Sequence, residues 1–259
     1  MRELHWSYSK LKLKKNLFIT TMALILALVA LFSIIPPVWE LSSSAIAIPS
    51  ADHKSFIEIG PRTKRWTPFN NISKHTIHAF IAAEDARFFE HQGFDVSATF
   101  RSLKTNIDKG KIVRGGSTIT QQVIKLAFLG QERTFSRKAK ELLGAILAEA
   151  LVSKEIILEW YLNLVPLGPG IYGVKAAAKQ YYNTSPDILT IQQSVNLALI
   201  LPRPNYWSKG LDTKKLTEFG HKRFAQIVQQ MYDYGYLTHD LKRLALATGD
   251  FGKPVKTGN

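Results

Sequence analysis

The chain has 259 residues, no cysteine, and 34 Lys and Arg residues against 20 Asp and Glu residues, which gives a formal net charge of +14. This length accommodates one sizeable domain, or one domain with a small additional lobe. The lack of cysteine excludes disulfides, thiolate catalysis and Cys-ligated zinc. The positive charge suggests an anionic partner, such as a nucleic acid, an acidic lipid or a phosphorylated substrate.

The N-terminal residues predict a membrane anchor. Residues 1–16 are strongly basic, and residues 17–35 contain no charged side chain. As a helix, this apolar run would span roughly 28 Å, enough to cross the hydrocarbon core of a bilayer. A cleaved signal peptide is the alternative, because Ala45-Ile46-Ala47 matches a cleavage pattern, but that site lies well beyond the apolar run. We expect a retained helix with a cytoplasmic N-terminus and an exported body, which argues against a nucleic-acid partner.

The remaining chain predicts one folded domain. Residues 36–65 show little periodicity and are interpreted as a linker or a membrane-skimming segment. We expect the domain at 66–245 and a loose C-terminal tail at 246–259. Strand signals are scarce, so the domain should be mainly helical. Apolar periodicity predicts a helix that starts after Ser73, one that starts at the turn near Thr118, and further helices near 100–107, 131–151, 154–163, 174–182, 189–201 and 221–232.

Glu84 is the first candidate for chemistry. It shares a helical face with Ile77, Ile81 and Phe88. Desolvation on an apolar face would raise the pKa of this carboxyl group toward the range of a proton acceptor at neutral pH. The alternative is that Glu84 lies at the edge of the face and reaches water, and the helical pattern alone favours that alternative.

Three further segments have ordinary structural interpretations. The Gly115-Gly116-Ser117-Thr118 stretch predicts a tight turn before a helix N-terminus, where exposed N–H groups favour anions, although such a turn alone is weak evidence for a site. Residues 131–141 are dense in charge, which is usual for a solvated helix face. The segment Gly168–Gly173 matches the dinucleotide fingerprint, but it follows a helix instead of a strand, so we do not expect a nucleotide there.

Four motifs occur in order along the chain. They are Glu84-Asp85-x-x-Phe88-x-x-His91-x-Gly93-x-Asp95, Gly115-Gly116-Ser117-Thr118-Ile119-Thr120-Gln121-Gln122, Arg137-Lys138-x-x-Glu141, and Lys154-x-x-Ile157-Leu158-Glu159-x-Tyr161-Leu162-Asn163. Together they resemble the family 51 glycosyltransferases, the peptidoglycan glycosyltransferases, and most closely the monofunctional biosynthetic members. The resemblance covers residues 60–235 and is far more specific than any one segment.

The resemblance implies a mainly helical fold, with a lysozyme-like lobe and a smaller, membrane-dipping jaw lobe that follow a single N-terminal transmembrane helix. It implies lipid II as substrate, extension of a glycan strand by β-1,4 transfer, and undecaprenyl pyrophosphate as leaving group. The expected place is the bacterial inner membrane, with the catalytic domain on its outer side. Expected partners are lipid II, the growing strand, membrane lipids and cell-wall synthesis proteins, with no nucleic acid and no organic cofactor.

The resemblance also implies roles for individual residues. Glu84 would be the general base on the 4-hydroxyl of the acceptor, and Glu141 would act at the pyrophosphate, directly or through a divalent cation such as Mg²⁺ or Mn²⁺. The expected supports of the site are Asp85, Phe88, His91 and Ser117. The expected substrate-binding residues are Thr118, Gln122, Lys125, Arg133, Arg137, Lys138 and Lys140. These roles suit the chemistry, because inversion needs a base on one face of the sugar and a pyrophosphate leaving group needs positive charge on the other.

Three departures from the family pattern leave alternatives open. Leu126 replaces the usual Asn, Tyr181-Tyr182-Asn183-Thr184 replaces an aromatic-Phe-x-Lys pattern, and a Glu usual near Gln193 is missing. None removes a proposed catalytic carboxylate. A lysozyme-like peptidoglycan hydrolase is one alternative, since two carboxylates also suit glycoside cleavage. A non-catalytic cell-wall scaffold is the other, and the departures would fit it.

Overall fold

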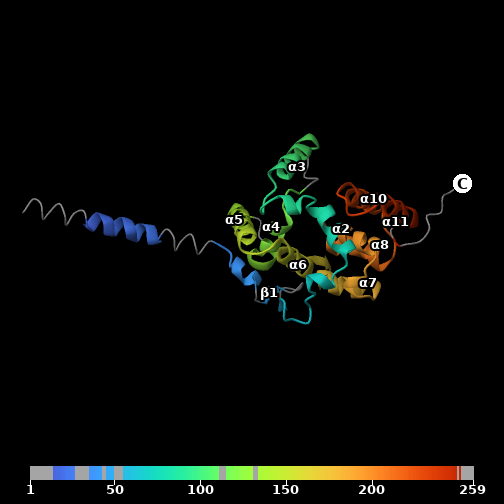
Figure 1. Cartoon of the computed structure of the whole chain (residues 1–259), viewed down its shortest axis with the longest axis horizontal. Helices are drawn as coiled ribbons and strands as arrows, with labels where there is room; N and C mark the ends of the chain where they lie inside the picture. Colours follow the sequence, from blue (N-terminus) through green and yellow to red (C-terminus); the bar gives the residue numbers. More distant parts are fainter. Residues whose placement is uncertain are drawn as a thin grey trace, which may run out of the picture. The chain divides into compact units, whose positions relative to one another are not determined.

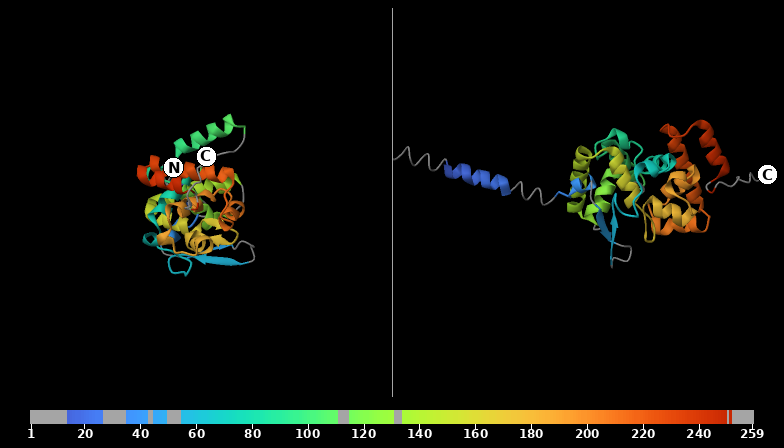
Figure 2. Two further views of the ribbon diagram at one scale, coloured as in Figure 1. Left: turned by 90° about the vertical axis from the view of Figure 1, so that its right-hand side faces the viewer. Right: turned by 60° about the horizontal axis from the view of Figure 1, so that its bottom comes forward.

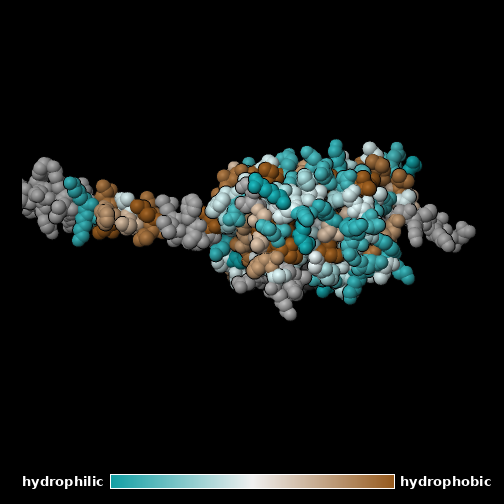
Figure 3. All heavy atoms as spheres, turned by 90° about the horizontal axis from the view of Figure 1, so that it is seen from below, coloured by the Kyte–Doolittle hydropathy of each residue, from teal (hydrophilic) through white to brown (hydrophobic). Residues whose placement is uncertain are grey.

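The structure is a computed structural model that describes residues 14–26, 35–42, 45–49, 55–110, 115–130, 134–249 and 251. The chain divides into two compact units, Met1–Pro36 and Pro37–Asn259. In the first unit, residues 14–26 form a helix whose exposed side chains are largely apolar (Figure 3). Residues 27–34 of the predicted anchor lie outside the described residues. No helix within the described part of the chain is both long and apolar enough to cross a membrane.

The second unit is mainly helical, as the sequence predicts (Figure 1). Its helices are α2 (Lys74–Glu84), α3 (Val96–Asp108), α4 (Ile119–Ile124), α5 (Phe135–Leu151), α6 (Lys154–Leu164), α7 (Gly173–Tyr182), α8 (Ile191–Leu199), α9 (Pro204–Asp212), α10 (Glu218–Asp233) and α11 (His239–Thr248). Shorter helical turns are η1 (Val38–Ser42), η2 (Phe69–Asn71), η3 (Phe88–Glu90), the π-helical η4 (Lys125–Leu129) and η5 (Pro186–Ile188).

The core lies where α2, α4, α6 and α8 pack together. Phe80 of α2 and Tyr161 of α6 are fully buried and meet edge to face, with ring centroids 6.2 Å apart. The hydroxyls of Thr76 and Ser194 join α2 to α8 through a buried hydrogen bond of 2.9 Å. Each large buried apolar side chain contributes about 1.5–3 kcal/mol, so this packing holds α2 and its C-terminal residue Glu84 in place.

The helix boundaries follow capping residues in the sequence. Thr118 and Thr190 each form a capping box at the start of α4 and α8, and Ser153 caps α6. Ser73 precedes α2 as predicted, but its hydroxyl donates to the carbonyl of Leu189 at 2.9 Å instead of capping the helix.

Two helices were not predicted. α9 begins at Pro204, a residue suited to the first helical position, and α11 begins after the N-cap Thr238. The expected last helix near 221–232 is α10, which begins earlier, at Glu218. The expected tail at 246–259 is wrong for its first residues, because α11 continues to Thr248.

The interpretation of residues 36–65 as a linker is also wrong for most of the segment that the structure describes. The carbonyl of Leu41 in η1 accepts a hydrogen bond from Trp160 Nε1 at 2.7 Å, in the core. Strands β1 (Ile46–Pro49) and β2 (Phe56–Ile59) pair antiparallel, and residues of β1 alternate between buried and exposed. The folded domain therefore begins near η1 instead of at 66. The segment is too short and too interrupted to show its period in the sequence.

The glycines of the formal dinucleotide fingerprint shape a hairpin. Strands β3 (Pro166–Gly168) and β4 (Ile171–Tyr172) pair antiparallel, and α7 starts directly afterwards. Gly173 has a φ of +76°, and a Cβ added there would lie 2.6 Å from the carbonyl oxygen of Asn163. Backbone geometry accounts for this glycine without a ligand.

Helix α3 lies at the outer edge of the second unit (Figures 1 and 2). Its N-terminus is capped by Asp95, whose side chain accepts from the backbone N–H of Ala98. Its apolar side chains are largely solvent-exposed, with 70% of Phe100 and 69% of Ile107 accessible. This helix therefore presents an apolar face that the domain does not cover.

Candidate active site

Glu84 is the last residue of α2 and is half-buried. Its Oε2 accepts a hydrogen bond of 2.9 Å from Gln122 Nε2 on the neighbouring α4. The surrounding protein removes water from the carboxylate and so raises its pKa above the usual value, while the Gln122 bond and the charges of Arg223 and Lys125 act in the opposite direction. A carboxylate of this kind is suited to accept a proton at neutral pH. The carboxyl group thus has the raised pKa expected of a desolvated position, although the residue keeps some contact with solvent.

Asp85 fixes the backbone that follows Glu84. Its buried carboxylate lies 3.0 Å from His91 Nε2 through each oxygen, and Oδ2 accepts from the backbone N–H of Ile119 at 2.9 Å. Ile119 is the first residue of α4, so this bond satisfies one of the N–H groups that a helix start leaves unpaired. A single carboxylate thus joins the end of α2, the segment around η3 and the start of α4, which fits the supporting roles expected for Asp85 and His91.

Lys154 contacts both Phe88 and His91. The ring of Phe88 is fully buried, and Lys154 Nζ lies 4.3 Å from its centroid. The same ammonium donates to the carbonyl of His91 at 2.7 Å and to Glu149 Oε1 at 2.8 Å. Phe88 therefore lies behind the site as a packing support.

The turn before α4 is tied to two other elements. Thr118 is buried, and its hydroxyl donates to the carbonyl of Gly93 at 2.8 Å while it caps α4. Ser117 Oγ accepts from Lys138 Nζ on α5 at 3.0 Å. Thr118 therefore joins the start of α4 to the segment around Gly93.

Glu141 is buried on α5 between two cations. Its Oε2 accepts from Arg137 Nη1 at 2.7 Å, and its Oε1 accepts from Lys138 Nζ. These are charge-assisted bonds, which are stronger than bonds between neutral groups. The two cations remain more exposed than the carboxylate they pair with, since 17% of the Arg137 side chain and 47% of the Lys138 side chain are accessible. The cluster therefore presents positive charge outward.

The charge of Lys125 interacts with both glutamates. Burial lowers the pKa of this half-buried ammonium, the charges of Arg137 and Lys138 add to that effect, and the charges of Glu141 and Glu84 oppose it. It begins η4, a five-residue π-helix that extends α4. Short π-helical segments occur frequently at functional sites, because they displace side chains from the regular helical path. Lys125 thus interacts electrostatically both with Glu84 and with the Glu141 cluster.

The other predicted residues fall into two groups. Lys140 is half-buried on α5, but within the described part of the chain it forms no ion pair with Glu84 or Glu141. Arg133 lies outside the described residues. Leu126, where the family pattern has Asn, packs against the hydrophobic core from η4. That departure therefore adds an apolar contact with the core.

The departure at Tyr181–Thr184 shapes the end of α7. Asn183 adopts the left-handed conformation with a φ of +51° and accepts from Lys179 Nζ at 2.6 Å. Lys214 Nζ donates to the carbonyl of Tyr181 at 2.6 Å and lies 4.6 Å from the ring centroid of Tyr182. Asn tolerates this conformation better than most residues, so it replaces a glycine-like cap here.

Two residues near Glu84 were missed in the sequence. Arg223 of α10 donates through Nη2 to the carbonyl of Ala83 at 3.2 Å, although 140 residues separate them. Tyr161 is fully buried, and desolvation, followed by the charges of Glu84 and Asp85, raises the pKa of its phenol well above the usual value. Tyr161 belongs to a quoted motif and could have been singled out as a neutral neighbour. Arg223 had no local signal, because only the packing of α10 on α2 brings it to the site.

The described residues do not contain a group of three or more His, Cys, Asp or Glu side chains that could hold a metal ion. Glu141, the carboxylate expected to act through a divalent cation, has both oxygens engaged by Arg137 and Lys138. A hard cation such as Mg²⁺ would compete with these partners for the same oxygens. The protein side chains at this site therefore do not fit a dedicated metal site.

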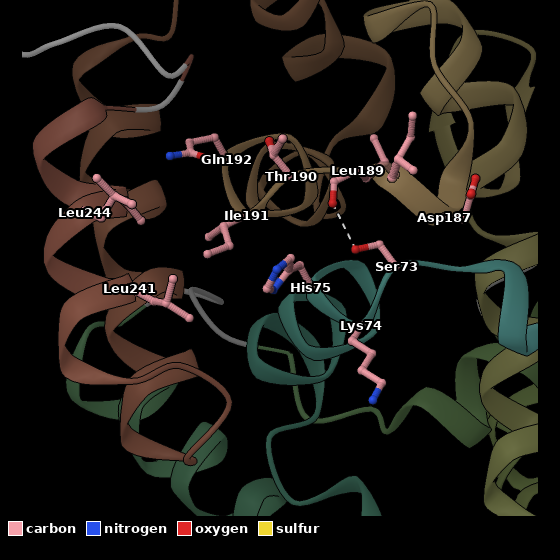
Figure 4. Close-up of a pocket in the computed structure, with 12 residues that line it drawn as sticks. Ser73, Lys74, His75, Asp187, Leu189, Thr190, Ile191, Gln192, Leu241 and Leu244 are labelled. Carbon is pink, nitrogen blue, oxygen red and sulfur yellow. Dashed lines mark hydrogen bonds between the residues drawn. The ribbon is translucent and has the colours of Figure 1, made fainter.

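A separate hollow of about 580 Å³ lies between the starts of α2 and α8 and the helix α11 (Figure 4). Its lining includes His75, Thr190, Leu241 and Leu244. Neither Glu84 nor Glu141 lines it, so it is distinct from the charged site.

The fold and the site together define a mainly helical protein with a desolvated carboxylate beside a buried carboxylate and a cationic cluster. Comparison with known proteins supports this class. Residues 52–232 match the family described as Transglycosylase. Because this match covers most of the chain, the chain belongs to the transglycosylase family, as the four motifs predicted.

Individual relatives carry the name biosynthetic peptidoglycan transglycosylase. The protein from Thiobacillus denitrificans is 44% identical over 143 residues, 55% of this chain and 62% of that protein. The protein from Paraburkholderia xenovorans is 45% identical over 144 residues, 56% of this chain and 60% of that protein. The protein from Burkholderia thailandensis is 35% identical over 223 residues, 83% of this chain and 81% of that protein. The chain thus aligns with about three-fifths of the first two relatives and with most of the third.

Proposed function

We propose that the protein is a peptidoglycan glycosyltransferase that polymerises lipid II into β-1,4-linked glycan strands and releases undecaprenyl pyrophosphate. The observation that carries the proposal is the pairing of a desolvated carboxylate, Glu84, with a cationic cluster around Glu141, with Lys125 electrostatically coupled to both. The names of the relatives support the substrate class.

The proposed reaction assigns Glu84 the first proton transfer. Glu84 accepts the proton of the acceptor 4-hydroxyl, and the hydroxyl oxygen attacks the anomeric carbon of the donor sugar. The bond between that carbon and the pyrophosphate oxygen breaks, and its electron pair leaves with the pyrophosphate. The Gln122 bond to Oε2 holds the carboxylate in one orientation during this transfer.

The cations stabilise the leaving group in this proposal. Lys125, Arg137 and Lys138 face the negative charge that develops on the pyrophosphate as the bond breaks. Glu141 bonds directly to Arg137 and Lys138, so its role is to direct these two cations. A donor site of this charge also explains part of the basic surplus of the chain.

The lipid-linked substrate requires a site near a bilayer. We assign the exposed apolar face of α3, with Phe100, Leu103 and Ile107, to a membrane-dipping jaw lobe beside a lysozyme-like lobe. Arg101 and Lys104 lie exposed on the same helix, and apolar residues flanked by cations are typical of interfacial helices. The proposed location is the bacterial inner membrane, with a single N-terminal span, a cytoplasmic N-terminus, the catalytic domain outside, and membrane lipids and cell-wall synthesis proteins as further partners.

A polymerisation assay tests the function. Purified full-length protein with lipid II should make glycan chains, and Glu84→Gln should abolish this product. Glu90→Gln is the matched control, because Glu90 is exposed and lies six residues away, outside the proposed machinery. Unchanged polymerisation by Glu84→Gln would contradict the assignment of the base.

The same preparation separates the alternatives. Release of soluble fragments from polymerised peptidoglycan, without consumption of lipid II, would indicate the hydrolase. Absence of any turnover by the folded protein would indicate the scaffold. Parallel reactions with Mg²⁺, with Mn²⁺ and with a chelator measure whether a divalent cation takes part.

A further inference from the structure

Arg223 connects the C-terminal part of the domain to the end of α2. It lies on α10, which packs against α2, and its neighbours Phe224 and Ile227 are buried in the core. Arg223 is half-buried, and its Nη2 donates to the carbonyl of Ala83 at 3.2 Å. Carbonyls in the last turn of a helix lack a partner within the helix, so a cation bound there stabilises the helix end.

We infer that Arg223 is a positioning residue for Glu84: it holds the end of α2 through Ala83 and keeps the Glu84 carboxylate ionised as donor substrate binds. The inference rests on the proposed function of Glu84 as general base. It assigns a role to a residue that lies outside the four sequence motifs.

Three charged and two neutral groups surround Glu84. Gln122 of α4 binds the carboxylate, Lys125 of η4 and Arg223 of α10 act on it as cations, and Asp85 acts as a second anion. Tyr161 of α6 is a neutral, fully buried phenol. Desolvation and Asp85 favour the protonated acid, so the ionised base depends on the two cations and on the Gln122 amide.

Lys125 and Arg223 would respond differently when the pyrophosphate of the donor substrate binds. In the proposed reaction Lys125 faces the pyrophosphate, which compensates its positive charge. Burial also lowers the pKa of Lys125, whereas a guanidinium stays charged at every working pH. Arg223 approaches from the side of α2, where it contacts Ala83, so its charge continues to act on Glu84 when the pyrophosphate is bound.

Substitutions at 223 separate the charge from the hydrogen bond. Arg223→Gln keeps an amide donor and removes the charge, and Arg223→Lys keeps the charge. Lys222→Met is the matched control, because Lys222 is exposed on the same helix and pairs with Glu218. The readouts are the dependence of kcat on pH with saturating lipid II, and the titration of the Glu84 side-chain carbon by ¹³C NMR, assigned with Glu84→Gln.

Arg223→Gln should move the acid limb of the kcat profile to higher pH, with roughly tenfold less activity at pH 6 and near-normal activity at pH 8.5, since one pH unit corresponds to tenfold in protonation. The NMR titration of Glu84 should move in the same direction. Arg223→Lys should keep the limb close to that of the wild type, and Lys222→Met should leave both readouts unchanged.

An equal loss of activity at every pH, with an unchanged Glu84 titration, would reduce Arg223 to a structural cap and overturn the inference. If Arg223→Gln melts below the assay temperature, Arg223→Lys decides: an acid limb displaced upward despite the retained charge would also overturn it. Wild-type activity in Glu84→Gln would refute the proposed function instead, and the NMR titration would still report on Arg223.

Discussion

Glu84 and Glu141 are both glutamates of the proposed active site, but their surroundings differ. Glu84 receives a hydrogen bond from a neutral amide and has a pKa raised by desolvation. Glu141 is more deeply buried and bonds directly to two cations. The comparison shows that the neighbours of a glutamate decide whether its pKa is raised or its carboxylate is held between two cations, and these surroundings suit the two roles proposed above.

The largest effect is expected for the proposed base. Glu84→Gln should lower kcat about a thousandfold, within the range of general-base catalysis, because the amide cannot accept the proton. Glu84 is the end of a well-packed helix, so the fold should persist. Circular dichroism and the polymerisation assay measure the two quantities, and a loss below tenfold would remove Glu84 from the role of base.

A smaller loss of activity is expected for Glu141→Gln, about a hundredfold, together with lower stability. The amide cannot satisfy Arg137 and Lys138 as the carboxylate does, so the free energy of unfolding should fall by about 1–3 kcal/mol. Denaturant unfolding measures this change. If Glu141→Gln lost activity with full stability, Glu141 would be a direct participant like Glu84, and the contrast between the two would fail.

Asp85→Asn tests the carboxylate that connects the end of α2 to His91 and to the start of α4. The substitution keeps the shape but weakens the bonds to His91 and to the N–H of Ile119, so we expect about 2 kcal/mol less stability and about tenfold lower kcat. The acid limb of the pH profile should not move upward, since one anion near Glu84 is lost. An upward displacement would show that the Asp85 charge does not act on Glu84 as described.

The smallest expected effect is a change in how the stability of the protein depends on pH. The folded-state pKa of Glu84 is raised, so its contribution to stability is fully present below the unfolded pKa and is lost as pH rises through the folded pKa. Glu84→Gln avoids this loss, so its Tm should exceed that of the wild type by about 2 °C at pH 8 and match it near pH 4. A lower Tm for the variant at pH 8 would contradict the desolvated environment of Glu84.

The helical content and the family followed from local patterns. Caps such as Thr118 and Thr190, apolar periodicity, and the four ordered motifs predicted most helices of the second unit. The missed elements were the β1–β2 hairpin, α9 and α11. Contacts with distant residues help to hold them, as in the 2.7 Å hydrogen bond that Gln192 Nε2 of α8 donates to Thr248 Oγ1 of α11, and local propensity carries little of that information.

Two glutamates and a set of cations could be named as candidates from the sequence alone, because the motifs place them in a fixed order. The different surroundings of the two glutamates became visible only in the folded domain. Desolvation raises the pKa of Glu84, whereas the Gln122 bond and the charge of Arg223 lower it. Gln122 and Arg223 lie on helices that are distant from α2 in the sequence. Burial and through-space charge act over a few ångströms in three dimensions, so spacing along the chain could not distinguish the surroundings of Glu84 from those of Glu141.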